Sequence, residues 1–474
     1  MLFLLPFTLL LFLRLPANSK KKQQQTNVRN ALSALHSTPL TTGDLSDALQ
    51  LAYNDEGIAG VLSHCHEYKI TETYEPKELV RAALQVPSKG AASGILNALI
   101  GSCCCHDGDG DGDGRDWKFA PSPISDGDAV KEEHMRNART ALRILQEYDD
   151  ASFEDLTTTA TTAKSSTITL ALKPNVVTLA LTYTASFQSY PRIANKLLSR
   201  AIIRQNLKTL DRPTELSGHG QTPASTLEIL LESEHFMIVN KLSGMVLTTA
   251  ETSANSKSRS SKQMIKDAPN LEQILLAHQA AHHHKPIRLS SINPDGSRGF
   301  VHRLDRGTSG CLIAAKTNQW HARLLTQFFL RRVEKSYIAL VYTNSISLPE
   351  EGTVTVPIDG RPAISSFQVL ERYPDDLITK IRVTTKQGRK HQVRIHCSKG
   401  LGAPILLDPL YGGESIMYRL PNDSCAKKYR AQQRICLHAD SLAISDLNIP
   451  KVEAAIPEWW DNLTKDIHHY SLVN

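Results

Sequence analysis

Apolar and polar residues recur with helical spacing in the first part of the chain. Residues 45–52 place apolar side chains on one face of a helix, and residues 132–148 do the same. The apolar positions of these two stretches are Ala48, Leu49, Leu51 and Ala52, then Ala138, Ala141, Leu142 and Leu145. We therefore predict a mostly α-helical region over residues 21–215.

A third helical block lies toward the end of this region. Residues 173–179 read KPNVVTL and residues 192–198 read RIANKLL, which predicts two helices joined by a short turn. The pair resembles a pentatricopeptide repeat, a helical unit that stacks into solenoids and reads single-stranded RNA. One unit does not make an array, because such solenoids need several units to bury a continuous core. Degenerate helical repeats and generic helical packing both stay open.

The predicted helical region contains a polar insertion near residues 103–128. Residues 107–114 alternate Asp and Gly, a feature of calcium-binding EF-hand loops. Such a loop needs a carboxylate at its twelfth position, and counting from Asp107 that position is Lys118. We therefore interpret the insertion as low-complexity, disordered chain.

The spacing of apolar residues changes from about residue 226 onward. Residues 226–232 and 236–241 favour β-strands, and short β-rich segments separated by Gly and Pro continue through most of the remaining chain. A Ser/Lys-rich insertion with three consecutive histidines interrupts them near residues 250–298. Strands and helices do not alternate as in parallel-sheet folds, so we predict an α+β domain over residues 216–465.

Composition is that of a globular protein with two or three domains. The chain has 474 residues, of which 41% are hydrophobic and 22% are charged. Its net charge of +6 suits a polyanionic partner without requiring one. None of the eight cysteines forms a CxxC pair, which favours a reducing compartment over a disulfide framework. We expect no metal site at Cys103, Cys104 and Cys105, because adjacent residues cannot all turn toward one ion.

The N-terminal residues are almost wholly apolar as far as Leu13, and Arg14 and Lys20 follow. This stretch is too short for a membrane-spanning helix, which needs about 20 residues. It resembles the core of a signal peptide. We interpret residues 1–20 as a targeting leader for an organelle, either mitochondrion or plastid. The alternative is that the start codon is mis-assigned. In that case the cytoplasm or the nucleus stays open as the compartment.

Candidate chemistry begins at residues 300–310, which read FVHRLDRGTSG. Asp305 lies between Arg303 and Arg306, and a carboxylate held ionised by cations is a recognisable catalytic arrangement. The same aspartate could instead cap the turn that follows it, because Asp side chains readily bind nearby backbone amides. These residues alone do not decide between the two interpretations.

Three further segments carry candidate chemistry. They are residues 236–246 with Asn240 and Lys241, the strand at 334–341 with Lys335 and Tyr337, and residues 388–396, which read GRKHQVRIH. Each alone has an ordinary explanation, since a strand tyrosine is usually packing and a basic run is usually a solvated face. Together with residues 300–310, in this order and spacing, they resemble the catalytic domain of RluA-type pseudouridine synthases over about residues 230–460.

The resemblance implies a mixed, mainly antiparallel β-sheet and an isomerase that converts uridine in rRNA or tRNA to pseudouridine without an external cofactor. It implies that Asp305 is the catalytic aspartate, as nucleophile or base, that Tyr337 stacks on the uracil, and that Arg394 pairs with Asp305. Arg303 is expected to help hold the target nucleotide out of the base stack. The other expected substrate-binding residues are Lys241, Arg389 and Lys390, as phosphate contacts, and Asn240, His302, His391 and Gln392.

Two positions depart from the family pattern. Leu407 stands where glycine is expected, and Leu242 stands where proline is usual. The sequence therefore predicts a reshaped loop at 403–408 and the loss of a rigid turn after Lys241. These departures and the insertion keep a second hypothesis open: a catalytically inactive RNA-binding or ribosome-assembly factor on the same scaffold. For either function we expect a monomer that binds RNA and, in the mature protein, neither metal nor membrane.

Overall fold

The computed structural model describes residues 40–104, 128–158, 175–187, 189–197, 227–247, 270–275, 289–290, 299–343, 346–373, 377–413 and 434–473. They fall into two compact units, one formed by the N-terminal helices and the other by a β-sheet with its covering helices. The predicted leader, the Asp/Gly repeat, most of the insertion at 250–298 and the boundary near residue 215 lie outside the described residues.

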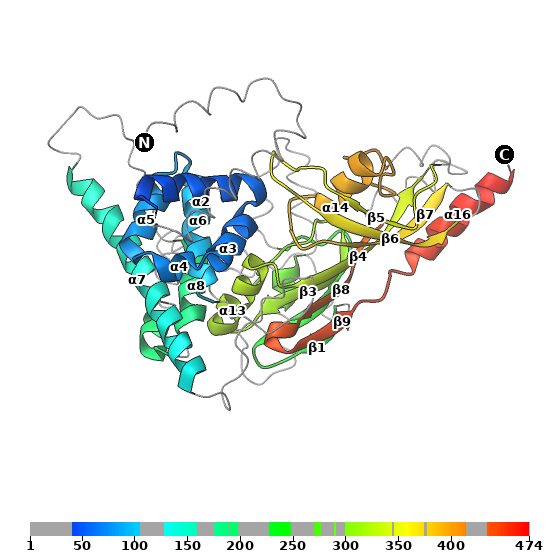
Figure 1. The fold of residues 1–474 in the computed structure, drawn as a ribbon. Helices are drawn as coiled ribbons and strands as arrows, with labels where there is room; N and C mark the ends of the chain where they lie inside the picture. Colours follow the sequence, from blue (N-terminus) through cyan, green and yellow to red (C-terminus); the bar gives the residue numbers. More distant parts are fainter. Residues whose placement is uncertain are drawn as a thin grey trace, which may run out of the picture. The chain divides into compact units, whose positions relative to one another are not determined.

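The N-terminal unit is helical, as predicted (Figure 1). Its helices are α2 (Thr42–Glu56), α3 (Ile58–Glu67), α4 (Ile70–Thr73), α5 (Pro76–Leu84), α6 (Lys89–Ser102), α7 (Asp128–Thr158) and α8 (Val176–Ser186). Three of them start where the sequence supplies a capping side chain: Thr41, Ser88 and Asn175 each accept a hydrogen bond from a first-turn amide. The pentatricopeptide-like repeat stays a prediction.

Helix α6 forms the centre of this unit. Nearly all of its residues from Ala91 to Gly101 are buried, and helices α2, α3, α5, α7 and α8 contact it. The apolar face predicted on α2 is buried at Ala48, Leu49 and Ala52. None of the described helices is both long and apolar enough to cross a membrane.

The second unit contains one mixed β-sheet. Its strands are β1 (Glu228–Glu232), β2 (Phe236–Lys241), β3 (Ser309–Ala315), β4 (Glu334–Tyr342), β5 (Glu351–Val354), β6 (Ser365–Arg372), β7 (Ile378–Thr384), β8 (Leu437–Ile444) and β9 (Ile449–Glu453). The order across the sheet is β1-β2-β3-β8-β4-β7-β6-β5, and β9 pairs with β8. Every pairing is antiparallel except that of β3 with β8, so the predicted α+β class with a mainly antiparallel sheet is confirmed.

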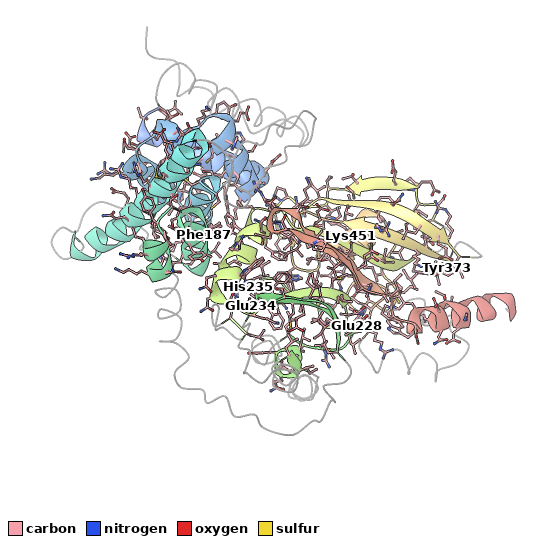
Figure 2. The ribbon with its side chains drawn as sticks, turned by 90° about the horizontal axis from the view of Figure 1, so that it is seen from below. Phe187, Glu228, Glu234, His235, Tyr373 and Lys451 are labelled. Atoms are coloured by element: carbon pink, nitrogen blue, oxygen red, sulfur yellow. The ribbon has the colours of Figure 1, made fainter. Side chains whose placement is uncertain are left out.

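Strands β2 and β3 are buried on both faces. Met237, Val239, Leu312 and Ala314 enter one apolar cluster, and the alternate residues of the same strands enter another. Helix α13 (Asn318–Phe329) covers the second cluster. His235, labelled in Figure 2, lies at the turn before β2. It stacks on Trp320 of this helix with ring centroids 5.3 Å apart. Burial on both faces explains why these strands lack the polar alternation of a surface strand.

The other half of the sheet carries two short helical segments and a longer C-terminal helix. Helix α14 (Gln392–Ile395) continues directly into a π-helical turn, η5 (His396–Gly400). Val393 and Cys397 from these segments enter the core around β4 and β7, as do Trp460 and Leu463 of α16 (Trp459–Val473). A 3-10 turn, η7 (Ser445–Leu447), joins β8 to β9. The core therefore fixes the position of α14 on the sheet.

The parallel contact between β3 and β8 is short and depends on a glycine. Ser309 pairs with His438 and Gly310 with Ala439. Gly310 has a φ of +111°, and a methyl group on it would overlap the backbone of Ala439. Only glycine fits this position without moving one strand, because it lacks a Cβ and tolerates positive φ.

We predict that Gly310→Ala destabilises the second unit by about 3 kcal/mol or more, because the new methyl group separates the two strands. Urea denaturation followed by circular dichroism measures the change. The matched control is Gly360→Ala, which also has positive φ (+71°) but has no atom within 4 Å of the added methyl group. The control should lose about 1 kcal/mol, the strain of the backbone alone. Equal losses in both variants would contradict the steric explanation.

Candidate active site

Asp305 lies in a tight turn between the 300–304 segment and β3. The backbone amide of Thr308 donates to the carbonyl of Asp305 over 3.0 Å, which closes the turn. The Asp305 side chain is about one-fifth exposed (20%), so its carboxylate remains accessible from solvent. Turn formation and an accessible carboxylate therefore coexist, and the turn is closed by the backbone and not by the side chain.

A buried lysine forms hydrogen bonds with the backbone of this turn. The Lys241 amine donates to four carbonyl oxygens, those of Leu242, Asp305, Arg306 and Thr308, over 2.7 to 3.3 Å. Lys241 is fully buried (0%), so the expectation that it contacts RNA phosphate is wrong. Its ammonium group, which would be costly to bury alone, is satisfied by the carbonyl oxygens of the turn. Lys241 thus shapes the turn that carries Asp305.

Arg394 of α14 joins Asp305 to a second carboxylate. Its Nη1 donates to Asp305 Oδ2 over 2.9 Å, as expected from the sequence. Its Nε and Nη2 donate to the two oxygens of Asp408, each over 2.7 Å, in a bidentate pair. Asp408 is fully buried, and its Oδ1 also accepts from the Leu410 amide over 3.0 Å. The sequence motifs gave Asp408 no role, but in the structure it sets the orientation of Arg394.

The charge of Arg394 is held by three neighbours. Burial opposes its charge, but hydrogen bonds and attraction from Asp408 and then Asp305 outweigh this and raise the pKa of Arg394. The Tyr411 ring lies under the guanidinium, 5.1 Å from its carbon to the ring centroid. Arg394 therefore stays a cation at every physiological pH.

His391 approaches the other oxygen of Asp305. Its Nε2 lies 3.6 Å from Asp305 Oδ1, and its Nδ1 lies 2.9 Å from the Tyr411 hydroxyl. Burial lowers the pKa of His391, although the charge of Asp305 opposes this shift. The neutral tautomer that satisfies both contacts carries its proton on Nε2, which faces the carboxylate, and accepts the tyrosine hydroxyl at Nδ1. His391, expected to bind substrate, thus lies beside Asp305.

Tyr337 lies on β4 beside the same carboxylate. Burial, and secondly the negative charge of Asp305, raises the pKa of Tyr337 to about 12. The phenol therefore stays neutral at physiological pH, and its ring remains partly exposed for an aromatic partner. Asp305, Tyr337 and Arg394, far apart in sequence, converge as expected.

Three residues expected to bind substrate have hydrogen bonds within the protein. His302 accepts the Ile313 amide at Nε2 (3.0 Å) and stacks on Phe328, and burial lowers its pKa to about 3. The Gln392 amide is buried: its oxygen accepts the Arg389 backbone amide, and its nitrogen donates to Ile364 O, Ser365 Oγ and Thr385 Oγ1. Asn240 is buried and donates to Glu228 across β1 and β2. Asn240 Oδ1 is buried without a hydrogen-bond partner among the described residues, and His302 is half-buried. Substrate binding by these three residues stays a prediction.

The remaining expected contacts lie nearer the surface. Arg303 and Lys390 are exposed, and Arg389 is half-buried and donates to the Pro362 carbonyl through two nitrogens. Binding of phosphate by these residues stays a prediction.

The two departures from the family pattern do not remove the local turns. Leu407 is buried and adopts a left-handed backbone with φ of +65°, the conformation that glycine would take most easily. Its amide donates to the Gly413 carbonyl over 2.9 Å. The turn after Lys241 also forms, with Gly244 donating to the Arg306 carbonyl over 2.8 Å. Hydrogen bonds therefore support a turn at both places, and the reshaped loop and the loss of rigidity stay predictions.

We predict that Asp408→Asn costs about 3–5 kcal/mol of unfolding free energy, because the buried Arg394 loses its charged partner. Urea denaturation measures the loss. Glu350→Gln is the control, since Glu350 pairs with Arg372 at the surface (2.6 Å) and should cost less than about 1 kcal/mol. Similar losses in the two variants would contradict a special role for the Arg394–Asp408 pair.

We predict that Lys241→Met destabilises the protein by on the order of 3 kcal/mol, because four carbonyl oxygens lose a charged donor. Hydrogen exchange should quicken at the Thr308 amide, which closes the turn, before other amides of the sheet change. A variant with unchanged exchange at this turn would contradict the supporting role of Lys241.

The sequence model of the RNA pseudouridylate synthase family matches residues 235–399. This segment contains Asp305, Tyr337 and Arg394, and ends before Asp408. The matched region therefore includes the Asp305–Arg394 ion pair described above.

Two bacterial relatives support the same assignment. The chain is 28% identical to ribosomal large subunit pseudouridine synthase D of Pseudomonas aeruginosa over 256 residues, which are 50% of this chain and 69% of that protein. It is 31% identical to the enzyme of the same name from Zymomonas mobilis over 250 residues, 49% of this chain and 69% of that protein. The solved structure of human RNA Pseudouridylate Synthase Domain Containing 4 aligns with a TM-score of 0.39 and 20% identity, over 51% of this chain and 93% of that one. The chain belongs to the RNA pseudouridine synthase family, with a catalytic domain of the RluA type.

Proposed function

We propose that this enzyme isomerises specific uridines in ribosomal RNA to pseudouridine, with Asp305 as its catalytic carboxylate. The observation that carries the proposal is the Arg394–Asp305 ion pair at 2.9 Å, beside a neutral Tyr337 and a partly exposed carboxylate. Ribosomal RNA is chosen because the relatives from Pseudomonas and Zymomonas are named for the large ribosomal subunit.

The reaction breaks the bond between C1′ of the ribose and N1 of uracil, and forms a bond between C1′ and C5. N1 gains a proton and C5 loses one, so no redox cofactor is needed. Asp305 acts as nucleophile or base on the flipped nucleotide. Arg394 holds one carboxylate oxygen and His391 faces the other, which limits rotation of the carboxylate. Tyr337 offers its ring to the detached uracil.

The exposed cations around this site fit an RNA backbone. We place Arg303 beside the flipped nucleotide and Lys390 against a phosphate. Both are exposed, and Arg303 shortly precedes Asp305 in the sequence as Lys390 shortly precedes Arg394. Phosphate contacts of this kind position RNA without reading its bases.

We predict that Asp305→Asn lowers kcat at least about a thousandfold while the protein stays folded, because asparagine keeps the shape and removes the charge. The measurement is tritium release from in vitro ribosomal RNA transcripts that carry 5-tritiated uridine. Asp461→Asn, an exposed residue on α16, is the control and should retain full activity. Wild-type turnover in Asp305→Asn would overturn the assignment.

The alternative of a catalytically inactive assembly factor predicts a different result. In cells lacking the protein, site-resolved pseudouridine mapping would then show ribosome-assembly defects without any lost pseudouridine. The two unusual positions and the insertion near residues 250–298 motivate this alternative, and the retained Asp305–Arg394 ion pair argues against it.

An organelle, mitochondrion or plastid, is our proposal for the compartment, and the apolar N-terminal residues support it. The location of a fluorescent protein fused to the C-terminus tests it.

A further inference from the structure

Lys335 is a half-buried cation that the mechanism above does not use. It lies on β4, two residues before Tyr337. No carboxylate among the described residues lies within the 4.0 Å ion-pair distance of its amine. Its amine lies over the Phe328 ring, 5.6 Å from Nζ to the centroid. An aromatic face compensates only part of the lost hydration of an ammonium group.

The segments around this amine are those that build the site. A methyl group on Gly388 would lie 3.6 Å from Lys335 Nζ, and Gly388 opens the segment that carries Arg394. His302 lies three residues before Asp305 and stacks on the same Phe328 ring. The charge of Lys335 adds to the effect of burial in lowering the pKa of His302. The amine therefore lies between the Asp305 segment and the Arg394 segment.

The charges near Lys335 do not neutralise it. Burial, and secondly repulsion from Arg331, lowers its pKa to about 8. Glu334, its neighbour on the strand, is exposed and accepts a hydrogen bond from Ser445. Arg303 next to His302, and Arg389 and Lys390 next to Gly388, add further positive groups on the adjacent segments. A negatively charged ligand would relieve this repulsion.

We propose that Lys335 binds a backbone phosphate beside the target uridine and so positions the flipped nucleotide on Tyr337. The strand geometry places Lys335 about 7 Å from Tyr337, at roughly 3.3 Å per residue. The ligand is a phosphate because the substrate is RNA, so this inference rests on the proposed function. Lys335 is a positioning residue in this scheme and takes no part in bond breaking.

The test compares Lys335→Met and Lys335→Arg with the wild type on the tritiated ribosomal RNA transcripts. Methionine removes the charge and keeps the apolar stem, so this variant should fold. We expect its KM for RNA to rise about tenfold with kcat changed less than about threefold, and arginine to restore most of the loss. The slope of log KM against log salt concentration should become shallower by about 0.7 to 0.9, the value of one phosphate contact.

Lys451→Met is the matched control. It removes one positive charge from the same unit, at an exposed residue paired with Glu453 over 2.6 Å. Its KM and salt slope should equal those of the wild type. A salt slope in Lys335→Met equal to that of the control would overturn the proposal, as would a loss confined to kcat or to stability.

The pH dependence gives a separate readout. Phosphate binding is tightest with the ammonium form, which is lost as the pH rises through about 8, so the KM of the wild type should rise about threefold between pH 7 and 8.5. Lys335→Arg should show no such rise, because arginine stays charged over this range. Dividing the KM of the wild type by that of Lys335→Arg at each pH removes the pH effects of Glu334, Lys390 and the RNA, which both proteins share. Equal pH profiles would contradict the proposal. If the wild type releases no tritium at all, the proposed function fails instead.

Discussion

The hydrogen bonds of one arginine hold the site together. Arg394 is bound by Asp408 in a bidentate pair, by Asp305 through a single hydrogen bond, and by the face of Tyr411. These contacts connect helix α14, the turn before β3 and the loop at 407–413. Because Asp408 occupies two nitrogens, only one is directed at Asp305, and the carboxylate keeps an accessible side. Arg394 thus orients Asp305 without enclosing it.

A second buried cation acts on the backbone of the same turn. Lys241 binds carbonyl oxygens around Asp305, while Arg394 binds its side chain. Strand β2 positions Lys241, and its pairing with β3 brings it beside residues that follow Asp305. Backbone and side chain of Asp305 are therefore fixed by two different elements of the sheet unit. Such preorganisation reduces the motion that must be lost when a substrate binds.

The basic residues of the sequence thereby divide into two groups. Lys241 and Arg394 are buried, and they donate hydrogen bonds to backbone carbonyl oxygens and to carboxylate oxygens, respectively. Arg303 and Lys390 are outside, where an RNA backbone can reach them. Residue type could not separate the groups, since every one of them is a plausible phosphate contact in a sequence. Burial separates them, because an ammonium or guanidinium group without water must find oxygen partners within the fold.

The sequence alone determined the helical N-terminal region, the α+β class and the pairing of Arg394 with Asp305, because hydrophobic spacing and motif order are local properties of the chain. The catalytic roles of Asp305, Tyr337 and Arg394 stay predictions. The sequence did not reveal the role of Asp408, and it assigned Asn240, His302 and Gln392 to the substrate although their hydrogen bonds lie within the protein. It also did not reveal that Leu407 adopts a left-handed backbone. Only the tertiary structure decided these points, because the partner of a polar side chain, and the packing that imposes a strained backbone, come from residues distant in sequence.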